Sequence, residues 1–155
     1  MINFEKIVSL LKANNCIFEE LSHDFVHTSK DAAKVRGTKI EFAAKAIVLK
    51  ADNKSIMCVL GGDKKIDFKK IKKTLGIKNL RLEDPNKVLE LTGCKIGTVP
   101  PLGNLFDLTT YFDVALKNSD YLVFSAASHY KSIKMPVKDY LEFTNPTLLD
   151  FSSLK

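Results

Sequence analysis

Residues 44–61 read AKAIVLKADNKSIMCVLG, and this stretch decides the expected fold. Two apolar runs rich in strand-forming residues flank Asp52, Asn53 and Lys54, a composition typical of hairpin turns. Because both runs are apolar at most positions, we expect two central strands with apolar residues on both faces.

The flanking sequence predicts helices with clear boundaries. Residues 3–13 carry apolar side chains at helical spacing. Asp67 and Gly76 are placed to begin and end a helix whose lysines point outward, and Asp84 with Pro85 opens another helix that Gly93 ends. Two more helices are expected, one between Thr28 and Gly37, opened by a capping box of Thr28 and Asp31, and one starting at Pro136.

Further strands are expected at residues 16–22, 80–82, 109–116, 121–126 and 132–135, and the tail after Pro146 is expected to be loosely held. Helices and strands interleave without a strict βαβ rhythm. We therefore predict an α+β fold with a mixed sheet, in a single domain spanning residues 1–155.

Composition narrows the class of protein. The chain of 155 residues is 45% hydrophobic, and its 24 basic residues outnumber its 18 acidic ones. It contains no run of about 18 apolar residues and no signal peptide, and its three cysteines lie far apart. We expect a cytoplasmic protein with reduced thiols, no metal, no cofactor, no membrane contact and no DNA partner.

Seven lysines between Lys64 and Lys78 face one acid, Asp67. Such a cluster suits a polyanion, and it equally fits a helix face that is simply solvated.

Common catalytic signatures are absent: the chain has no GxSxG, no Walker loop, no HExxH and no GxGxxG. Cys94 has no base that the sequence can place beside it, so we interpret it as a packing residue.

Lys45 shares a strand face with Ile47 and Leu49 by two-residue periodicity. A lysine at the start of a strand can extend to water. It can equally present a cation at the mouth of an apolar pocket, where it would bind an anionic group such as a phosphate.

Residues 93–103 read GCKIGTVPPLG and contain three of the seven glycines and two of the five prolines of the chain. Glycine admits unusual backbone angles and close ligand approach, and proline stiffens the rest. Exposed amides in such a loop could stabilise the oxyanion of ester hydrolysis. The alternative is a plain turn after a helix.

Five segments in order resemble the YbaK and prolyl-tRNA-synthetase-associated family of editing domains, which deacylate mischarged tRNA. The resemblance covers about residues 21–143. The segments are HDFVHTSKDAAKVRG, AKAIVLK, GGDKKIDFKKIKKTLG, GCKIGTVPPLG and FSAASHYKSIKM.

The resemblance implies a strongly curved mixed sheet surrounded by helices, and a site without a protein nucleophile. Lys45 would fix the phosphate or ribose of the terminal adenosine, and the loop from Gly97 to Pro101 would meet the aminoacyl carbonyl. A free ribose hydroxyl would assist water. The implied substrate contacts are Thr28, Pro101, Gly103, Ser128 and His129; the alternatives are helix capping for Thr28 and a buried imidazole for His129.

Two positions depart from the family pattern, because Ser125 and Ala127 stand where the family often has Asn and Gly. The accepted amino acid is therefore open. We predict a free-standing deacylase of mischarged tRNA, with a synthetase as a second candidate partner. The alternatives are a non-catalytic module that binds tRNA, a synthetase or a nucleotide, and an enzyme for another small ester or amide.

Overall fold

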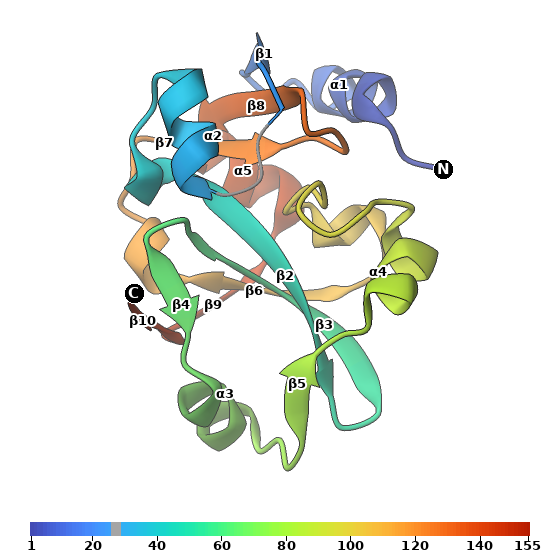
Figure 1. Ribbon diagram of the computed structural model, residues 1–155, viewed down its shortest axis with the longest axis vertical. Helices are drawn as coiled ribbons and strands as arrows, with labels where there is room; N and C mark the ends of the chain where they lie inside the picture. Colours follow the sequence, from blue (N-terminus) through green and yellow to red (C-terminus); the bar gives the residue numbers. More distant parts are fainter. Residues whose placement is uncertain (26–28) are drawn as a thin grey trace.

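A five-stranded sheet forms the centre of the protein (Figure 1). The computed structural model describes residues 1–25 and 29–155. The strand order is β5 (Leu80–Leu82), β2 (Ala44–Ala51), β3 (Lys54–Gly61), β6 (Thr109–Asp113) and β9 (Thr147–Leu149). The pairs β3–β6 and β6–β9 are parallel and the others antiparallel, which confirms the expected mixed sheet.

The β2–β3 hairpin is the one that the sequence predicted. Ala51 pairs with Lys54 across a two-residue turn, and Asp52 in that turn has a φ of 52°. Asp residues tolerate this left-handed conformation better than most, which explains the turn composition.

Two smaller sheets complete the strands. One contains β1 (Glu19–Ser22), β8 (Lys131–Pro136) and β7 (Tyr121–Ser125), and the other pairs β10 (Ser152–Leu154) with β4 (Lys64–Ile66). A parallel bridge between Ala43 and Val123 links the first of them to the start of β2.

In the described ranges, five α-helices surround the sheets: α1 (Phe4–Ala13), α2 (Ser29–Arg36), α3 (Phe68–Leu75), α4 (Pro85–Thr92) and α5 (Val137–Thr144). The ends of α3 and α4 lie at the predicted residues, although the Asp84 side chain makes no capping hydrogen bond. The Asp67 side chain accepts from the Lys70 N–H at 3.2 Å, and Gly76 and Gly93 end α3 and α4 in the left-handed conformation. The predicted capping residue of α2, Thr28, lies outside the described residues.

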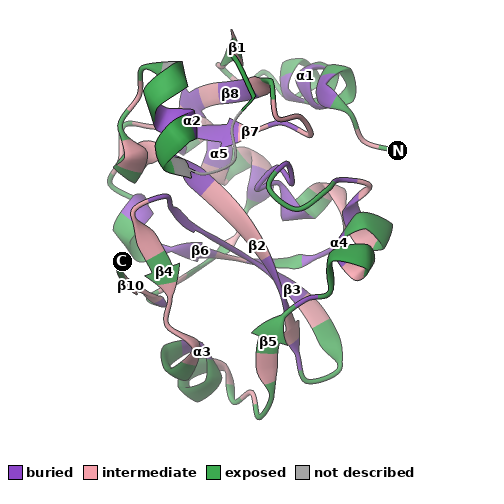
Figure 2. Ribbon diagram, viewed as in Figure 1, coloured by how far each residue is buried: buried purple, intermediate pink, exposed green. Residues whose placement is uncertain are grey.

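The central hairpin contributes to two hydrophobic cores. Figure 2 shows buried segments along both of its strands. Ala44 and Val48 face the larger core, which is also formed by α1, α4, α5 and the β7–β8 hairpin. Leu49 and Ala51 face the smaller core, which includes Ile71 of α3. Because consecutive strand residues point to opposite faces, β2 contributes to both cores.

The structure corrects the expectation of a loosely held tail after Pro146. Residues of the tail form β9 and β10, and Phe151 between them is fully buried in the smaller core. The pairing partners lie far away in sequence, so local pattern did not indicate them.

Three expected strands are shorter than predicted, and one of them, β7, loses only its last residue because it ends at Ser125. The first begins only at Glu19, and β6 ends at Asp113. The Asp113 side chain accepts from the Ala115 N–H at 3.4 Å and caps a 3-10 helix (Val114–Leu116), which ends the strand. No helix in residues 1–25 and 29–155 is long and apolar enough to cross a membrane.

Candidate functional site

The glycine- and proline-rich loop after α4 is fixed on one side and open on the other. Thr98 donates its hydroxyl to the Lys95 carbonyl at 2.7 Å, and the Tyr140 hydroxyl donates to the Pro101 carbonyl. Residues 98–103 are buried, whereas residues 95–97 are exposed. The loop therefore presents a short exposed tip on a rigid base.

Gly97 ends that tip with a φ of 91°, a conformation that favours glycine. A Cβ at this position would lie 3.6 Å from Cε1 of His129, so the two predicted site residues are neighbours. Within residues 1–25 and 29–155, the Gly97 N–H has no hydrogen-bond acceptor. An exposed amide of this kind is available to an oxyanion.

Cys94 lies near the base of the loop and is buried in the larger core. This burial agrees with its interpretation as a packing residue. Burial raises the pKa of its thiol, while a hydrogen bond with Thr92 opposes the rise. A thiol with a raised pKa is a poor nucleophile at neutral pH.

A second loop, between β7 and β8, packs against the first one. The Ala127 N–H donates to the Thr98 carbonyl at 3.0 Å. Ala127 has a φ of 61°, an uncommon value for a residue with a side chain. The Ser128 hydroxyl accepts from the Tyr130 N–H at 3.0 Å, so it stabilises the turn that carries His129.

His129 belongs to a partly exposed aromatic group. Its ring centroid lies 4.4 Å from that of Phe25, and the Phe25 and Tyr130 centroids are 5.6 Å apart. The imidazole is half-buried, so the alternative of a fully buried histidine is not what the structure shows.

A cavity of about 440 Å³ opens beside Gly97 and is called here the Gly97 cavity. It lies between the middle of β2, the end of β5 and the start of α4. Its lining is mostly apolar and is formed by Ala46, Ile47, Val48, Leu82, Glu83, Asp84, Pro85, Val88, Ile96, Gly97 and Val99. A mostly apolar pocket with a few polar groups is typical of small-molecule sites.

Glu83 is the buried carboxylate of this cavity, and sequence reasoning missed it. Burial alone would raise its pKa. The Glu83 carboxylate accepts hydrogen bonds from the Ser55 hydroxyl at 2.6 Å and from the Asp84 N–H at 3.1 Å. These bonds and the nearby cations Lys50 and Arg81 outweigh burial and hold the pKa of Glu83 below its ordinary value. The carboxylate is therefore ionised at neutral pH. Its place directly before the expected cap Asp84 gave no signal of burial.

Lys45 does not meet the Gly97 loop in this structure. Its side chain leaves β2 on the face of Leu49, and its ammonium donates to the Lys64 carbonyl at 2.6 Å. Burial and the neighbouring charge of Lys155 lower the pKa of Lys45 to about 8, and Asp63 opposes that shift. The structure thus places the two residues predicted as catalytic in different surroundings.

Pro101 and Gly103 lie on the buried side of the loop. A Cβ on Gly103 would come within 1.8 Å of the Thr110 Oγ1, so β6 packs too closely for any side chain there. These two residues shape the loop, and their contact with a substrate stays a prediction.

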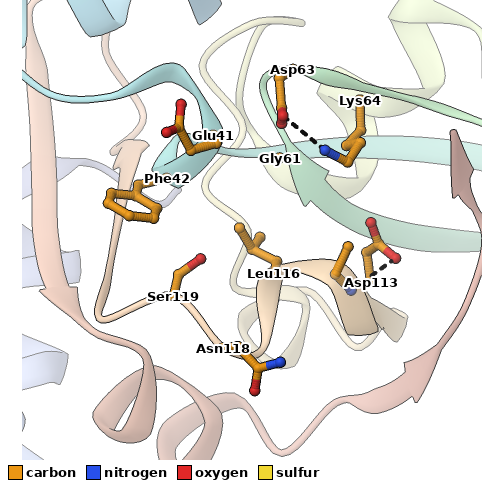
Figure 3. Close-up of a pocket in the computed structure, with 10 residues that line it drawn as sticks. Glu41, Phe42, Gly61, Asp63, Lys64, Asp113, Leu116, Asn118 and Ser119 are labelled. Atoms are coloured by element: carbon orange, nitrogen blue, oxygen red, sulfur yellow. Dashed lines mark hydrogen bonds and ion pairs between the residues drawn. The ribbon is translucent and has the colours of Figure 1, made fainter. Parts of the chain in front are cut away.

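Another cavity, of about 220 Å³, lies near Lys64 and is bounded by the 3-10 helices at Ile40–Phe42 and Val114–Leu116 (Figure 3). Asp63 and Lys64 form an ion pair at 2.8 Å on its wall. None of the predicted site residues that the structure describes lines this cavity. In the described part of the chain, no group of three or more His, Cys, Asp or Glu side chains could hold a metal ion.

The class of protein follows from the comparison with known families. Residues 23–143 match the sequence profile of the aminoacyl-tRNA editing domain, so the chain belongs to this family and the resemblance found in the sequence is confirmed.

Relatives cover most of the chain. It is 28% identical over 155 residues to the multifunctional Ser/Thr-tRNA deacylase ProXp-y of Escherichia coli K12, covering 97% of this chain and 93% of that protein. It is 36% identical over 118 residues to the uncharacterised protein YwhH of Bacillus subtilis, covering 76% and 74%.

A crystal structure described as a candidate trans-editing enzyme for prolyl-tRNA synthetase superposes with a TM-score of 0.86 at 22% identity, covering 97% of this chain and 96% of that one. This likeness confirms the predicted α+β fold.

Proposed function

We propose that the protein is a deacylase of mischarged aminoacyl-tRNA that acts in trans. The observation that carries the proposal is the exposed Gly97 amide at the edge of an apolar cavity of about 440 Å³. Membership of the editing family and the likeness to a protein named Ser/Thr-tRNA deacylase support it.

The proposed reaction is hydrolysis of the ester between an amino acid and the terminal ribose. Water attacks the carbonyl carbon, and the free hydroxyl of the same ribose assists its deprotonation. The Gly97 N–H donates to the oxyanion of the tetrahedral intermediate, which is where a fixed dipole lowers the barrier most. The bond to the ribose oxygen then breaks, giving a free amino acid and a tRNA with both hydroxyls restored.

The Gly97 cavity suits the aminoacyl group. Its apolar wall would hold a small side chain, and the ionised Glu83 would attract the substrate's α-ammonium. Editing sites of this kind are needed because a synthetase separates substrates that differ by one methylene by only about 1–3 kcal/mol.

His129 and Ser128 would complete the far side of the site. The His129 ring lies beside Gly97 and packs against Phe25 with an interplanar angle of 34°, so a terminal base could extend this aromatic surface. Ser128 would act through the turn that its hydroxyl stabilises.

The role of Lys45 is a separate proposal. To bind the phosphate or ribose of an adenosine at Gly97, its ammonium would have to leave the Lys64 carbonyl. A binding-induced exchange of that hydrogen bond for a charge-assisted one to phosphate is energetically reasonable.

The test is a panel of mischarged tRNAs, beginning with seryl and threonyl esters. We expect one or more esters to be hydrolysed faster than in the blank, and Lys45→Ala to lower kcat/KM. If no ester is lost faster than in the blank while tRNA still binds, the non-catalytic module is the correct reading.

A further inference from the structure

A cavity of about 400 Å³ lies beside the edge strand β5 and carries an excess of positive charge. We call it the basic cavity. Four cations line it together with one carboxylate, Asp52, and the lining comprises Lys50, Asp52, Lys72, Lys78, Asn79, Leu80 and Arg81. The Asp52 carboxylate already accepts from the backbone N–H groups of Lys78 at 3.3 Å and Asn79 at 2.9 Å. Lys50 and Arg81 also lie close enough to the Glu83 carboxylate to lower its pKa, so the less compensated charges are those of Lys72 and Lys78.

The fold brings these cations together against their mutual repulsion. Lys50 and Arg81 are directly opposite in the β2–β5 ladder, and like charges at such positions destabilise a sheet. Arg81 has one exposed ion pair, with Asp84 at 3.6 Å, which contributes little. Among the residues that the structure describes, the ammonium groups of Lys72 and Lys78 form no ion pair. Lys72 and Lys78, which form no ion pair among the described residues, and the like-charged pair of Lys50 and Arg81 are what a bound polyanion would stabilise.

The basic cavity lies further along the same two strands than the Gly97 cavity, and the two share no lining residue. Val48 and Leu82 line the Gly97 cavity, and Lys50 and Leu80, two positions further along, line the basic one. Two residues of a strand span about 7 Å. Figure 1 shows β5 between α4, which borders the Gly97 cavity, and α3, which carries Lys72. A polynucleotide ending in the first cavity would pass the second.

We infer that the basic cavity binds backbone phosphates of the tRNA acceptor strand, a few nucleotides before the aminoacylated end. This inference rests on the proposed function. Arg81 offers a planar fork for two phosphate oxygens, and the lysines supply point charges. The sequence left open whether the outward lysines of α3 are solvated or bind a polyanion. The inference gives one of them, Lys72, a polyanion as its partner.

The experiment compares two substrates with the same aminoacyl ester: a mischarged tRNA and the 3′-aminoacyl ester of adenosine, which lacks upstream phosphates. The variants are Lys72→Ala, Lys78→Ala and the double variant. Lys12→Ala is the matched control, because Lys12 is an exposed lysine of α1, at the opposite end of the molecule in Figure 1.

We expect each substitution in the cavity to lower the ratio of kcat/KM for the tRNA to kcat/KM for the adenosine ester several-fold. The slope of log affinity for tRNA against log salt should fall by about 0.7–0.9 for each lost phosphate contact. Lys12→Ala should change neither quantity.

A double variant with the ratio and salt slope of the wild type would overturn the inference and leave the deacylase proposal standing. If the wild type hydrolyses neither ester, the proposed function fails, and binding of uncharged tRNA at several salt concentrations then decides the inference alone. Equal salt slopes for the wild type and the double variant would overturn the inference. So would unchanged tRNA binding combined with lost binding to phosphatidylserine vesicles, which would assign the cations to a lipid surface.

Discussion

The Ala127 N–H donates a hydrogen bond of 3.0 Å to the carbonyl of Thr98, the residue directly after Gly97. This bond joins the β7–β8 loop to the glycine- and proline-rich loop. It fixes His129 beside the exposed amide although the two lie more than thirty residues apart in sequence. The geometry of the site therefore depends on the backbone conformation of Ala127.

Ala127→Gly should stabilise the protein. Ala127 adopts a φ of 61°, and the left-handed conformation costs a residue with a Cβ roughly 1–2 kcal/mol. Glycine removes most of that strain, so urea unfolding should show a gain of about 1 kcal/mol. Ala127→Val should be less stable than the wild type, because a β-branched residue fits this conformation worse. A glycine variant less stable than the wild type would show that Ala127 is not strained.

Gly97→Val should abolish most deacylation while leaving the fold intact. The nearest atom to a Cβ at Gly97 is Cε1 of His129 at 3.6 Å, so packing tolerates the first carbon, whereas the larger side chain blocks carbonyl approach to the amide. Loss of one oxyanion donor costs roughly 100- to 1,000-fold in kcat in enzymes that use one. Single-turnover hydrolysis of a mischarged tRNA measures the effect.

The control for backbone strain is Gly37→Val. Gly37 has a φ of 70° and open space around its Cβ position, so it suffers a similar conformational cost without touching the Gly97 cavity. We expect both variants to lose similar stability and only the Gly97 variant to lose activity. Equal losses of activity would attribute the effect to stability, and unfolding of the Gly97 variant alone would support a purely structural turn.

Local features of the fold could be predicted from the sequence because their determinants are close together. The β2–β3 hairpin, the Asp67 cap and the stops at Gly76 and Gly93 each depend on residues within one turn or one hydrogen bond. The tail could not be predicted in this way. Its strands pair with β6 and β4, and the burial of Phe151 depends on contacts that no local pattern encodes.

The candidate site shows the same difference between features with local determinants and features that depend on distant residues. Backbone freedom at Gly97 is visible in the loop composition, whereas the assignment of His129 to the same site came only from the family resemblance. Glu83 was missed because its hydrogen-bond partner Ser55 lies in β3, 28 residues away in sequence. The partner of the Lys45 ammonium is a backbone carbonyl nineteen residues away, and strand periodicity gives the face of a side chain without the position of its end.

Lys45→Met should stabilise the protein at neutral pH, by an amount that shrinks as the pH rises. Burial, followed by the charge of Lys155, lowers the pKa of Lys45 to about 8 from its ordinary 10.5. The folded state therefore disfavours the ammonium. This cost is fully present below pH 8 and disappears as the pH rises towards 10.5, because the folded protein releases the proton before the unfolded chain does. Half-burial and solvent screening reduce the expected gain to on the order of 1 kcal/mol at pH 7.

Urea unfolding of both proteins at pH 7 and pH 10 measures this difference, with Lys138→Met as the control at an exposed lysine of α5. The control should shift stability little and equally at both pH values. If the difference in unfolding free energy between Lys45→Met and the wild type is independent of pH, the folded wild-type protein does not lower the pKa of Lys45, and the prediction fails. If stability rises and deacylation falls in the same variant, Lys45 is retained for function at a cost in stability, which is the relationship expected of a functional residue.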